Sequence, residues 1–143
     1  MSRMIFVNLP VTDLARSRKF YEALGFTFNP QFSNEQGAAM VWSDAIVVML
    51  VSHDLWKTFT TRAIVDAHTS AQVGLCVNVD SREQVDALVA AGVAAGGVAD
   101  ANPPQDHGFM YQRTVEDPDG HIWEPMWMDP AVASGETLPE QAA

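Results

Sequence analysis

The sequence predicts an α+β fold made of two β-α-β-β-β modules, whose curled mixed sheets surround a cup and carry their helices on the convex faces. The first supporting observation is the run of residues 5–11, where apolar side chains alternate with a period of two before a helical stretch. The second is that residues 73–79 repeat this alternation and also precede a helical stretch. The expected helix starts, Asp13 and Ser81, lie 68 residues apart, so a strand–helix unit recurs at half-chain spacing.

The first module is expected to open with the strand at residues 5–11, whose alternate apolar side chains face a helix. Asp13 is a suitable N-cap for a helix over residues 14–24, and Gly25 suits the position just after it. The strands predicted next are residues 26–32, 38–42 and 45–51.

The second module is expected to repeat this order. Ser81 and Gln84 form a possible capping box, and Gly92 is expected to close the helix that they begin. Residues 117–120 read Asp-Pro-Asp-Gly, which is a strong hairpin turn by residue type. The strands predicted around this turn are a short piece near Gly97, then residues 109–115 and 121–128.

We expect a single domain over residues 1–129, since a chain of 143 residues can bury one core. Module one is expected at about 4–52 and module two at about 72–129. Residues 53–71 would connect the two modules with helical pieces. Residues 130–143, rich in Ala, Glu, Pro and Ser, are expected to form a mobile tail.

Composition excludes several classes of partner. The formal charge of −10 argues against nucleic acid and against anionic membranes, both of which favour a basic surface. The longest apolar stretch, residues 45–51, is far too short to cross a bilayer. The N-terminus lacks the pattern of a signal peptide, and the single Cys76 suits a reducing compartment, so we expect a cytoplasmic protein.

Three motifs resemble the glyoxalase / bleomycin-resistance / extradiol dioxygenase (vicinal oxygen chelate) superfamily. LPVTDLARSRKFYEALGF resembles its opening strand and helix, and EDPDGHIWEPMW resembles its closing hairpin. QDHGFMYQRTVEDPDGHIWE is similar to a branch related to lactoylglutathione lyase. With the duplicated half, the resemblance covers residues 4–129. It implies the paired β-α-β-β-β fold, usually as a homodimer with binding sites in the cups.

In catalytic branches of that superfamily, up to four side chains hold a divalent metal. The resemblance carries these ligand positions onto Phe6, Met49, Gly74 (or Val73 if the register slips by one) and Glu124. Nickel, zinc, manganese and iron need several nitrogen or oxygen donors, which here only Glu124 supplies. We therefore predict no metal site and no cofactor, although an unusual site of Asn8, His107 and Glu124 remains open.

The candidate ligand-binding residues are Phe6, Asn8, Met49, His107, Tyr111, Arg113 and Glu124. Glu124 is the candidate catalytic residue, as a base or as an anchor for a ligand donor. Tyr111 and Arg113 share a strand face and could bind a carboxylate group, although Arg113 could instead pair with Glu116. Cys76 is interpreted as inert.

Three hypotheses about function follow. The first is a small-molecule-binding protein with a degenerate metal site, similar to the drug-sequestering bleomycin-resistance proteins. The second is an enzyme with an altered Ni, Zn, Mn or Fe site, either a glyoxalase I-type lyase or an extradiol-type dioxygenase. The third is a metal-free acid–base isomerase with Glu124 as base and Tyr111 or His107 as acid. The sequence leaves open whether the protein is an enzyme.

Overall fold

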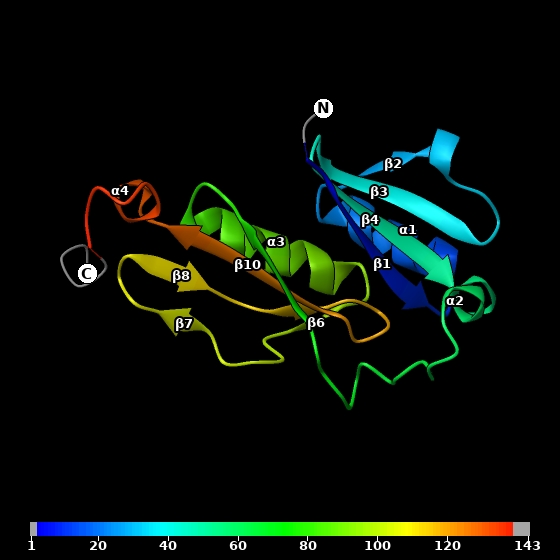
Figure 1. Cartoon of the computed structure of the whole chain (residues 1–143). Helices are drawn as coiled ribbons and strands as arrows, with labels where there is room; N and C mark the ends of the chain where they lie inside the picture. The colour runs from blue at the N-terminus through cyan, green and yellow to red at the C-terminus, as the bar shows by residue number, and fades with distance from the viewer. Residues whose placement is uncertain (1–2, 139–143) are drawn as a thin grey trace. The chain divides into compact units, whose positions relative to one another are not determined.

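The computed structural model describes residues 3–138, which form two compact units (Figure 1). The first unit extends to Ser70 and includes the hairpin tip Pro118–His121. The second unit contains Ala71–Asp117 and continues from Ile122. Each unit holds one β-α-β-β-β module, which confirms the predicted α+β class and the repeat of the strand–helix unit.

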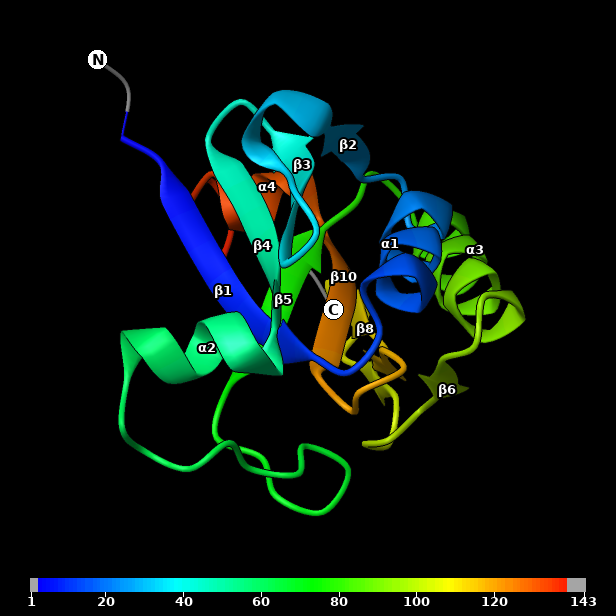
Figure 2. The same cartoon turned by 90° about the vertical axis from the view of Figure 1, so that its right-hand side faces the viewer.

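The first unit has a four-stranded sheet in the order β1-β4-β3-β2. β1 and β4 are parallel, and the other two pairs are antiparallel. The helix α1 packs on β2, β3 and β4, along one face of the sheet (Figures 1 and 2). The elements of this unit are β1 (Ile5–Val11), α1 (Leu14–Ala23), β2 (Thr27–Asn29), the 3-10 turn η1 (Pro30–Phe32), β3 (Gly37–Ser43), β4 (Ile46–Ser52) and α2 (His53–Phe59).

The core of the first unit lies between α1 and the sheet. Phe20 and Tyr21 of α1 are fully buried, as are Met40 and Leu50 of the sheet. The two rings meet edge to face at 5.1 Å, an arrangement that aromatic quadrupoles favour. Asp13 accepts a hydrogen bond from the Arg16 N–H at 3.0 Å, so the predicted N-cap is confirmed.

The second unit has a sheet built around its last strand. β10 pairs in parallel with β5 and antiparallel with β8 and β9. The helix α3 packs on β10, β9, β8 and β6. The elements of this unit are β5 (Gly74–Asn78), α3 (Arg82–Ala94), β6 (Val98–Ala99), β7 (Gln105–Asp106), β8 (Met110–Gln112), β9 (Val115–Glu116), β10 (Ile122–Met128) and α4 (Pro130–Ala133).

Helix α3 begins as predicted but ends later. The Ser81 hydroxyl oxygen accepts a hydrogen bond from the Gln84 N–H at 3.1 Å, and the Gln84 side chain accepts one from the backbone of Asp80 at 2.9 Å. The prediction that Gly92 closes the helix is wrong. Gly92 is buried inside α3, and Gly96 adopts the positive φ of +100° that follows the helix end.

The prediction of one continuous strand over residues 109–115 is wrong. The segment divides into β8 and β9, and the break falls at Arg113 and Thr114. Thr114 is buried, and its hydroxyl group bonds to the backbone N–H of Asn102 at 3.0 Å and to its carbonyl at 3.2 Å. At Thr114, hydrogen bonds to the loop that contains Asn102 therefore interrupt the strand. The short strand β7 has no counterpart in the prediction.

The connection after β4 starts with α2 and continues as an extended loop (Figure 2). The expected tail begins with the short helix α4, and its residues 139–143 lie outside the described residues. Within residues 3–138, no helix has the length and apolar character needed to cross a membrane. The single-domain boundaries and the mobility of the tail remain predictions.

Candidate functional site

An apolar cavity of about 750 Å³ lies on the face of the first sheet that points away from α1. Phe6, Asn8 and Met49 all line it, and Asn8 lies directly opposite Met49 in the β1–β4 pair. The Phe6 side chain is 57 % exposed, which leaves its ring available to a ligand. The remaining wall is largely apolar, with Met4, Phe32, Val41 and Val47, and its polar members are Asn29, Ser43 and Asp44.

The carboxylate of Glu124 lies on the corresponding face of the second sheet, where it is half-buried. Gln112 donates a hydrogen bond from Nε2 to Glu124 Oε2 at 3.1 Å. A Cβ atom built on Gly74 would overlap the Glu124 carboxylate, so the carboxylate occupies the space of a side chain at position 74. Burial, and then the negative charge of Glu124, raise the pKa of the Cys76 thiol, which agrees with an unreactive cysteine.

The two modules place these residues at equivalent registers. In the first unit Met49 lies opposite Asn8, two residues beyond Phe6 on the same strand. In the second unit Glu124 lies opposite Cys76, two residues beyond Gly74. Residues 44–49 overlay residues 119–124 in the sequence, and the structure gives Met49 and Glu124, the last residues of these two segments, the same strand register in their units.

These residues do not fit the divalent metal of the catalytic branches. A phenyl ring and a glycine offer no donor, and the thioether of Met49 is a soft ligand. The remaining carboxylate, that of Glu124, already accepts a hydrogen bond from Gln112. Among residues 3–138, no group of three His, Cys, Asp or Glu side chains lies close enough together to hold a metal ion.

Tyr111 and Arg113 lie on the face of the second sheet that α3 covers. The Tyr111 hydroxyl donates a hydrogen bond to Asp86 of α3 at 2.7 Å, and Arg113 also donates to Asp86, at 3.0 Å. Arg113 makes a second ion pair with Asp100 at 2.8 Å, so the expected alternative partner, Glu116, is wrong. Because side chains alternate along a strand, Gln112 points the opposite way, toward Glu124.

These contacts also shift the pKa values of the groups involved. The hydrogen bond from the Tyr111 hydroxyl, followed by that from Arg113, lowers the pKa of Asp86, and the hydrogen bond from Arg113 lowers the pKa of Asp100. Asp86 in turn raises the pKa of Tyr111. This cluster joins α3 to the sheet and lies apart from Glu124, so the structure does not bring Tyr111 together with the proposed base.

His107 lies in the turn between β7 and β8. Its Nε2 atom is 3.3 Å from the side-chain oxygen of Gln105, and its ring stacks on Phe109 with centroids 6.0 Å apart. Asp106, the residue before His107, binds Arg82 through both oxygens at 2.8 and 2.9 Å. His107 directly follows β7, whereas Glu124 belongs to β10, and these two strands pair with opposite edges of β8.

A second cavity of the first unit contains histidines that the sequence analysis did not select. His53, His68 and His121 line a space of about 970 Å³. No local motif marks them, because they come from three separate segments of the chain. The one sequence feature that relates to them is Gly120. Its lack of a side chain allows the hairpin tip to pack against the backbone at His68.

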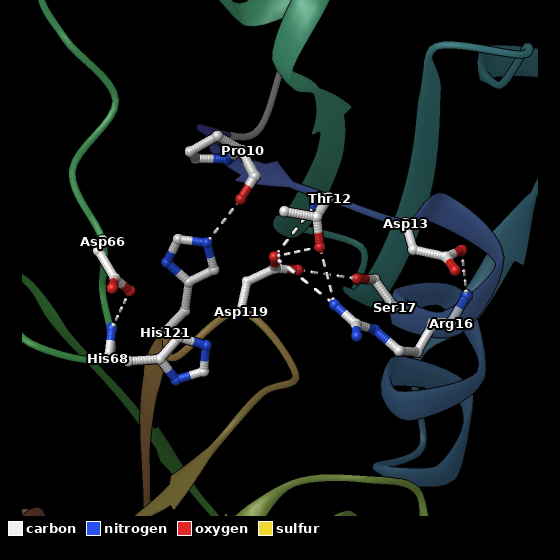
Figure 3. Close-up of polar contacts among 9 residues, drawn as sticks. All are labelled: Pro10, Thr12, Asp13, Arg16, Ser17, Asp66, His68, Asp119 and His121. Atoms are coloured by element: carbon white, nitrogen blue, oxygen red, sulfur yellow. Dashed lines mark hydrogen bonds and ion pairs between the residues drawn. The ribbon is translucent and has the colours of Figure 1, made fainter.

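The hairpin tip holds one wall of this cavity in place (Figure 3). Asp119 accepts hydrogen bonds from the Thr12 N–H at 3.0 Å, the Thr12 hydroxyl at 2.8 Å and the Ser17 hydroxyl at 3.3 Å. His121 Nε2 lies 2.8 Å from the Pro10 carbonyl oxygen, which can only accept a hydrogen bond. Nε2 of His121 is therefore the donor, and its ring is fixed at the edge of the cavity.

Comparison with known proteins relates this architecture to one group. The family profile described as "Bleomycin resistance protein-like N-terminal" matches residues 3–42. A glyoxalase-related enzyme from Fulvimarina pelagi is 29 % identical, with a TM-score of 0.68, over 89 % of this chain and 88 % of that chain. No curated protein sequence matches the chain.

Two further solved structures have the same fold. A hypothetical protein, SA1046 from S. aureus, has a TM-score of 0.73 and 26 % identity over 89 % of this chain and 95 % of that chain. A glyoxalase/bleomycin resistance protein/dioxygenase family enzyme from Burkholderia phytofirmans PsJN has a TM-score of 0.72 and 19 % identity, over 89 % and 99 % of the respective chains.

Proposed function

Because this chain belongs to the glyoxalase / bleomycin-resistance / dioxygenase superfamily, we propose that it binds a small, largely apolar organic molecule without the help of a metal. The binding site is the cavity lined by Phe6, Asn8 and Met49. The observation that supports this proposal best is the wall itself, which carries the apolar side chains of Phe6 and Met49 at two of the four positions that the family resemblance assigns to metal ligands.

The cavity has the features of a binding site for an organic molecule. Its volume of about 750 Å³ falls in the range of roughly 300–1,000 Å³ that is typical of ligand pockets. Phe6 offers a ring face, and Met49 offers an adaptable side chain that fits ligands of different shapes. The amide of Asn8 both donates and accepts hydrogen bonds, so it would orient one polar group of the ligand.

Glu124 has no catalytic role in this proposal. A general base must reach the proton that it removes, and it needs an acid partner on the same side of the substrate. The Glu124 carboxylate instead accepts a hydrogen bond from Gln112, and Tyr111 donates to Asp86 on the opposite face. This arrangement favours ligand binding over acid–base chemistry.

The binding test uses the neutral fluorescent probe N-phenyl-1-naphthylamine and two phenylalanine variants. Phe6→Ala should weaken probe binding by about fivefold, since it removes roughly 1 kcal/mol of apolar contact. Phe59→Ala is the matched control, because Phe59 is 55 % exposed and lies outside this cavity. Equal effects of the two substitutions, or no binding by the unaltered protein, would contradict the proposal.

A second test addresses the metal-dependent alternative. We expect protein purified from medium containing nickel, zinc, manganese and iron to hold well under one equivalent of any of them. Probe affinity should also survive Glu124→Gln. A stoichiometric metal that is lost in Glu124→Gln would refute metal-free binding and favour a lyase or dioxygenase.

The cellular and oligomeric context belongs to the same proposal. We place the protein in the cytoplasm as a homodimer, the usual assembly of the superfamily it resembles. Analytical ultracentrifugation over a range of concentrations measures the mass directly. A mass of one chain at every concentration would contradict the homodimer and would leave the binding proposal to the probe experiments.

A further inference from the structure

The first unit contains a second cavity, distinct from the apolar one, with a volume of about 970 Å³. Its wall comes from α1, α2, the loop of residues 60–68 and the hairpin tip. Gly120 packs so closely on this loop that a Cβ atom there would lie 2.5 Å from the His68 backbone nitrogen. The loop and the hairpin tip are therefore in direct packing contact, and the cavity that they line is part of the folded unit.

The charge of this cavity contrasts with that of the chain. Three of the eight Lys and Arg residues line it, but only two of the eighteen Asp and Glu residues do. Three of the four histidines line it as well. A protein with a formal charge of −10 thus has a cavity whose wall carries more Lys and Arg residues than Asp and Glu residues. Such a cavity concentrates field lines that attract an anion.

Two of the three cations of this cavity are available, because only Arg16 is paired, with Asp119 at 3.8 Å among the described residues. The carboxylates of the cavity are engaged. Within residues 3–138, the ammonium group of Lys57 and the guanidinium group of Arg62 form no ion pair or side-chain hydrogen bond. The Asp119 carboxylate binds Thr12 and Ser17, as described above. The Asp66 carboxylate accepts a hydrogen bond from the His68 backbone N–H at 3.0 Å (Figure 3).

We propose that this cavity binds the phosphate group of a small organic phosphate. A phosphate ester carries close to two negative charges at neutral pH, so several cations can bind it together. Arg62 would supply a planar fork of donors and Lys57 a point charge, the two recognised modes of binding phosphate. The exposed hydroxyl group of Thr61 on the same wall can donate to a further phosphate oxygen.

The apolar residues of the wall would contact the organic group of the ligand. Ile64, Val65 and Pro118 line the cavity beside the charged groups, and Val65 is 64 % exposed. A molecule with a phosphate at one end and an apolar group at the other would contact both kinds of surface. An inorganic phosphate ion would contact only the cations, so the ester should bind more tightly.

Isothermal titration calorimetry of the full chain with phenyl phosphate, inorganic phosphate and benzoate tests the proposal. Phenyl phosphate should bind at least about fivefold more tightly than either other ligand. Inorganic phosphate of equal affinity would overturn the assignment to an organic ester. Benzoate of equal affinity would overturn the assignment to phosphate.

Variants that remove one positive charge locate the binding site. Lys57→Gln and Arg62→Gln should each weaken the binding of phenyl phosphate by about fivefold to tenfold. Lys19→Gln is the matched control, because Lys19 is an exposed lysine of the same unit outside the cavity. Equal effects of Lys57→Gln and Lys19→Gln would overturn the proposed site.

This inference is separate from the proposed function, and its failure can be recognised separately. Phe6→Ala should leave phenyl phosphate binding unchanged, and Lys57→Gln should leave binding of the neutral probe unchanged. Loss of phenyl phosphate binding in Phe6→Ala would overturn the assignment to the second cavity.

Discussion

Gly74 and Glu124 share one space on the second sheet, since a Cβ atom at position 74 would lie 3.0 Å from Cδ of Glu124 and would overlap a carboxylate oxygen. The absence of a side chain at one position therefore permits the observed position of the other. In the first unit the equivalent pair is Phe6 and Met49, which line an apolar cavity. The same register thus holds a carboxylate in one module and apolar side chains in the other.

Gly74→Ala should destabilise the protein by about 1 kcal/mol. The added methyl group displaces the flexible Glu124 side chain, which then loses its hydrogen bond from Gln112. In a Glu124→Ala background the same substitution should have almost no effect, because its obstacle is gone. Urea denaturation of the four proteins measures this coupling, and equal effects in both backgrounds would contradict it.

Gly120→Ala should destabilise the first unit more than Gly25→Ala. Both glycines adopt a positive φ, of +91° and +102°, so both substitutions strain the backbone. Only Gly120 also faces backbone atoms of the loop, at 2.5 to 2.9 Å, whereas Gly25 has open space around it. We expect a difference of about 1–3 kcal/mol in the free energy of unfolding. Similar values would mean that the loop moves away at little cost.

Asp119→Ala should reduce the free energy of unfolding by roughly 2–3 kcal/mol. It removes the acceptor for both Thr12 groups and for the hydroxyl of Ser17, which is fully buried. Thr12→Val removes only the threonine hydroxyl and should reduce stability by about 1 kcal/mol. Denaturant titrations would test this order, and a larger effect of Thr12→Val would show that Asp119 does not hold the hairpin tip.

The ion pair between Arg82 and Asp106 predicts a pH effect. The Arg82 guanidinium, followed by the Gly108 N–H, lowers the pKa of Asp106 from 3.8 to about 2. Because the pKa is lower in the folded state, the stabilising effect is complete above about pH 4 and is lost as the pH falls through 2. Arg82→Gln should raise the pKa of Asp106 toward its ordinary value.

Carboxyl-detected NMR titration of the wild type and of Arg82→Gln measures this pKa directly. Arg18→Gln is the control, since Arg18 pairs with Glu22 on α1 in the first unit and should leave Asp106 unchanged. An unchanged Asp106 pKa in Arg82→Gln would show that the arginine does not cause the shift.

Local sequence signals predicted the elements where one pattern dominates. The strand Ile5–Val11 has the predicted bounds because its alternation is unbroken and Asp13 caps the next helix. Ser81 marked the start of α3 for the same reason. Gly92 misled the prediction of its end, since a glycine stops a helix only where the backbone reaches positive φ, which here occurs at Gly96.

The sequence predicted which residues of the two modules occupy equivalent strand positions at the candidate site. It did not predict the hydrogen-bond partners of these residues. The overlay of residues 44–49 on residues 119–124 was enough to align Met49 with Glu124. The sequence did not indicate that Gln112 would bind Glu124 while Tyr111 faced Asp86, because this depends on how β8 pairs with β10. Strand pairing determines which face of a sheet a side chain occupies.

The sequence by itself determined the class of fold, the repeat of the module and the absence of hard donor atoms at three of the four metal-ligand positions. Only the tertiary structure decided which polar groups meet, as with Thr12 and Asp119, which bond across 107 residues of chain. The physical reason is the distance along the chain over which each kind of interaction acts. Caps and periodic patterns act over a few residues, whereas cavities and buried hydrogen bonds form only when distant segments pack together.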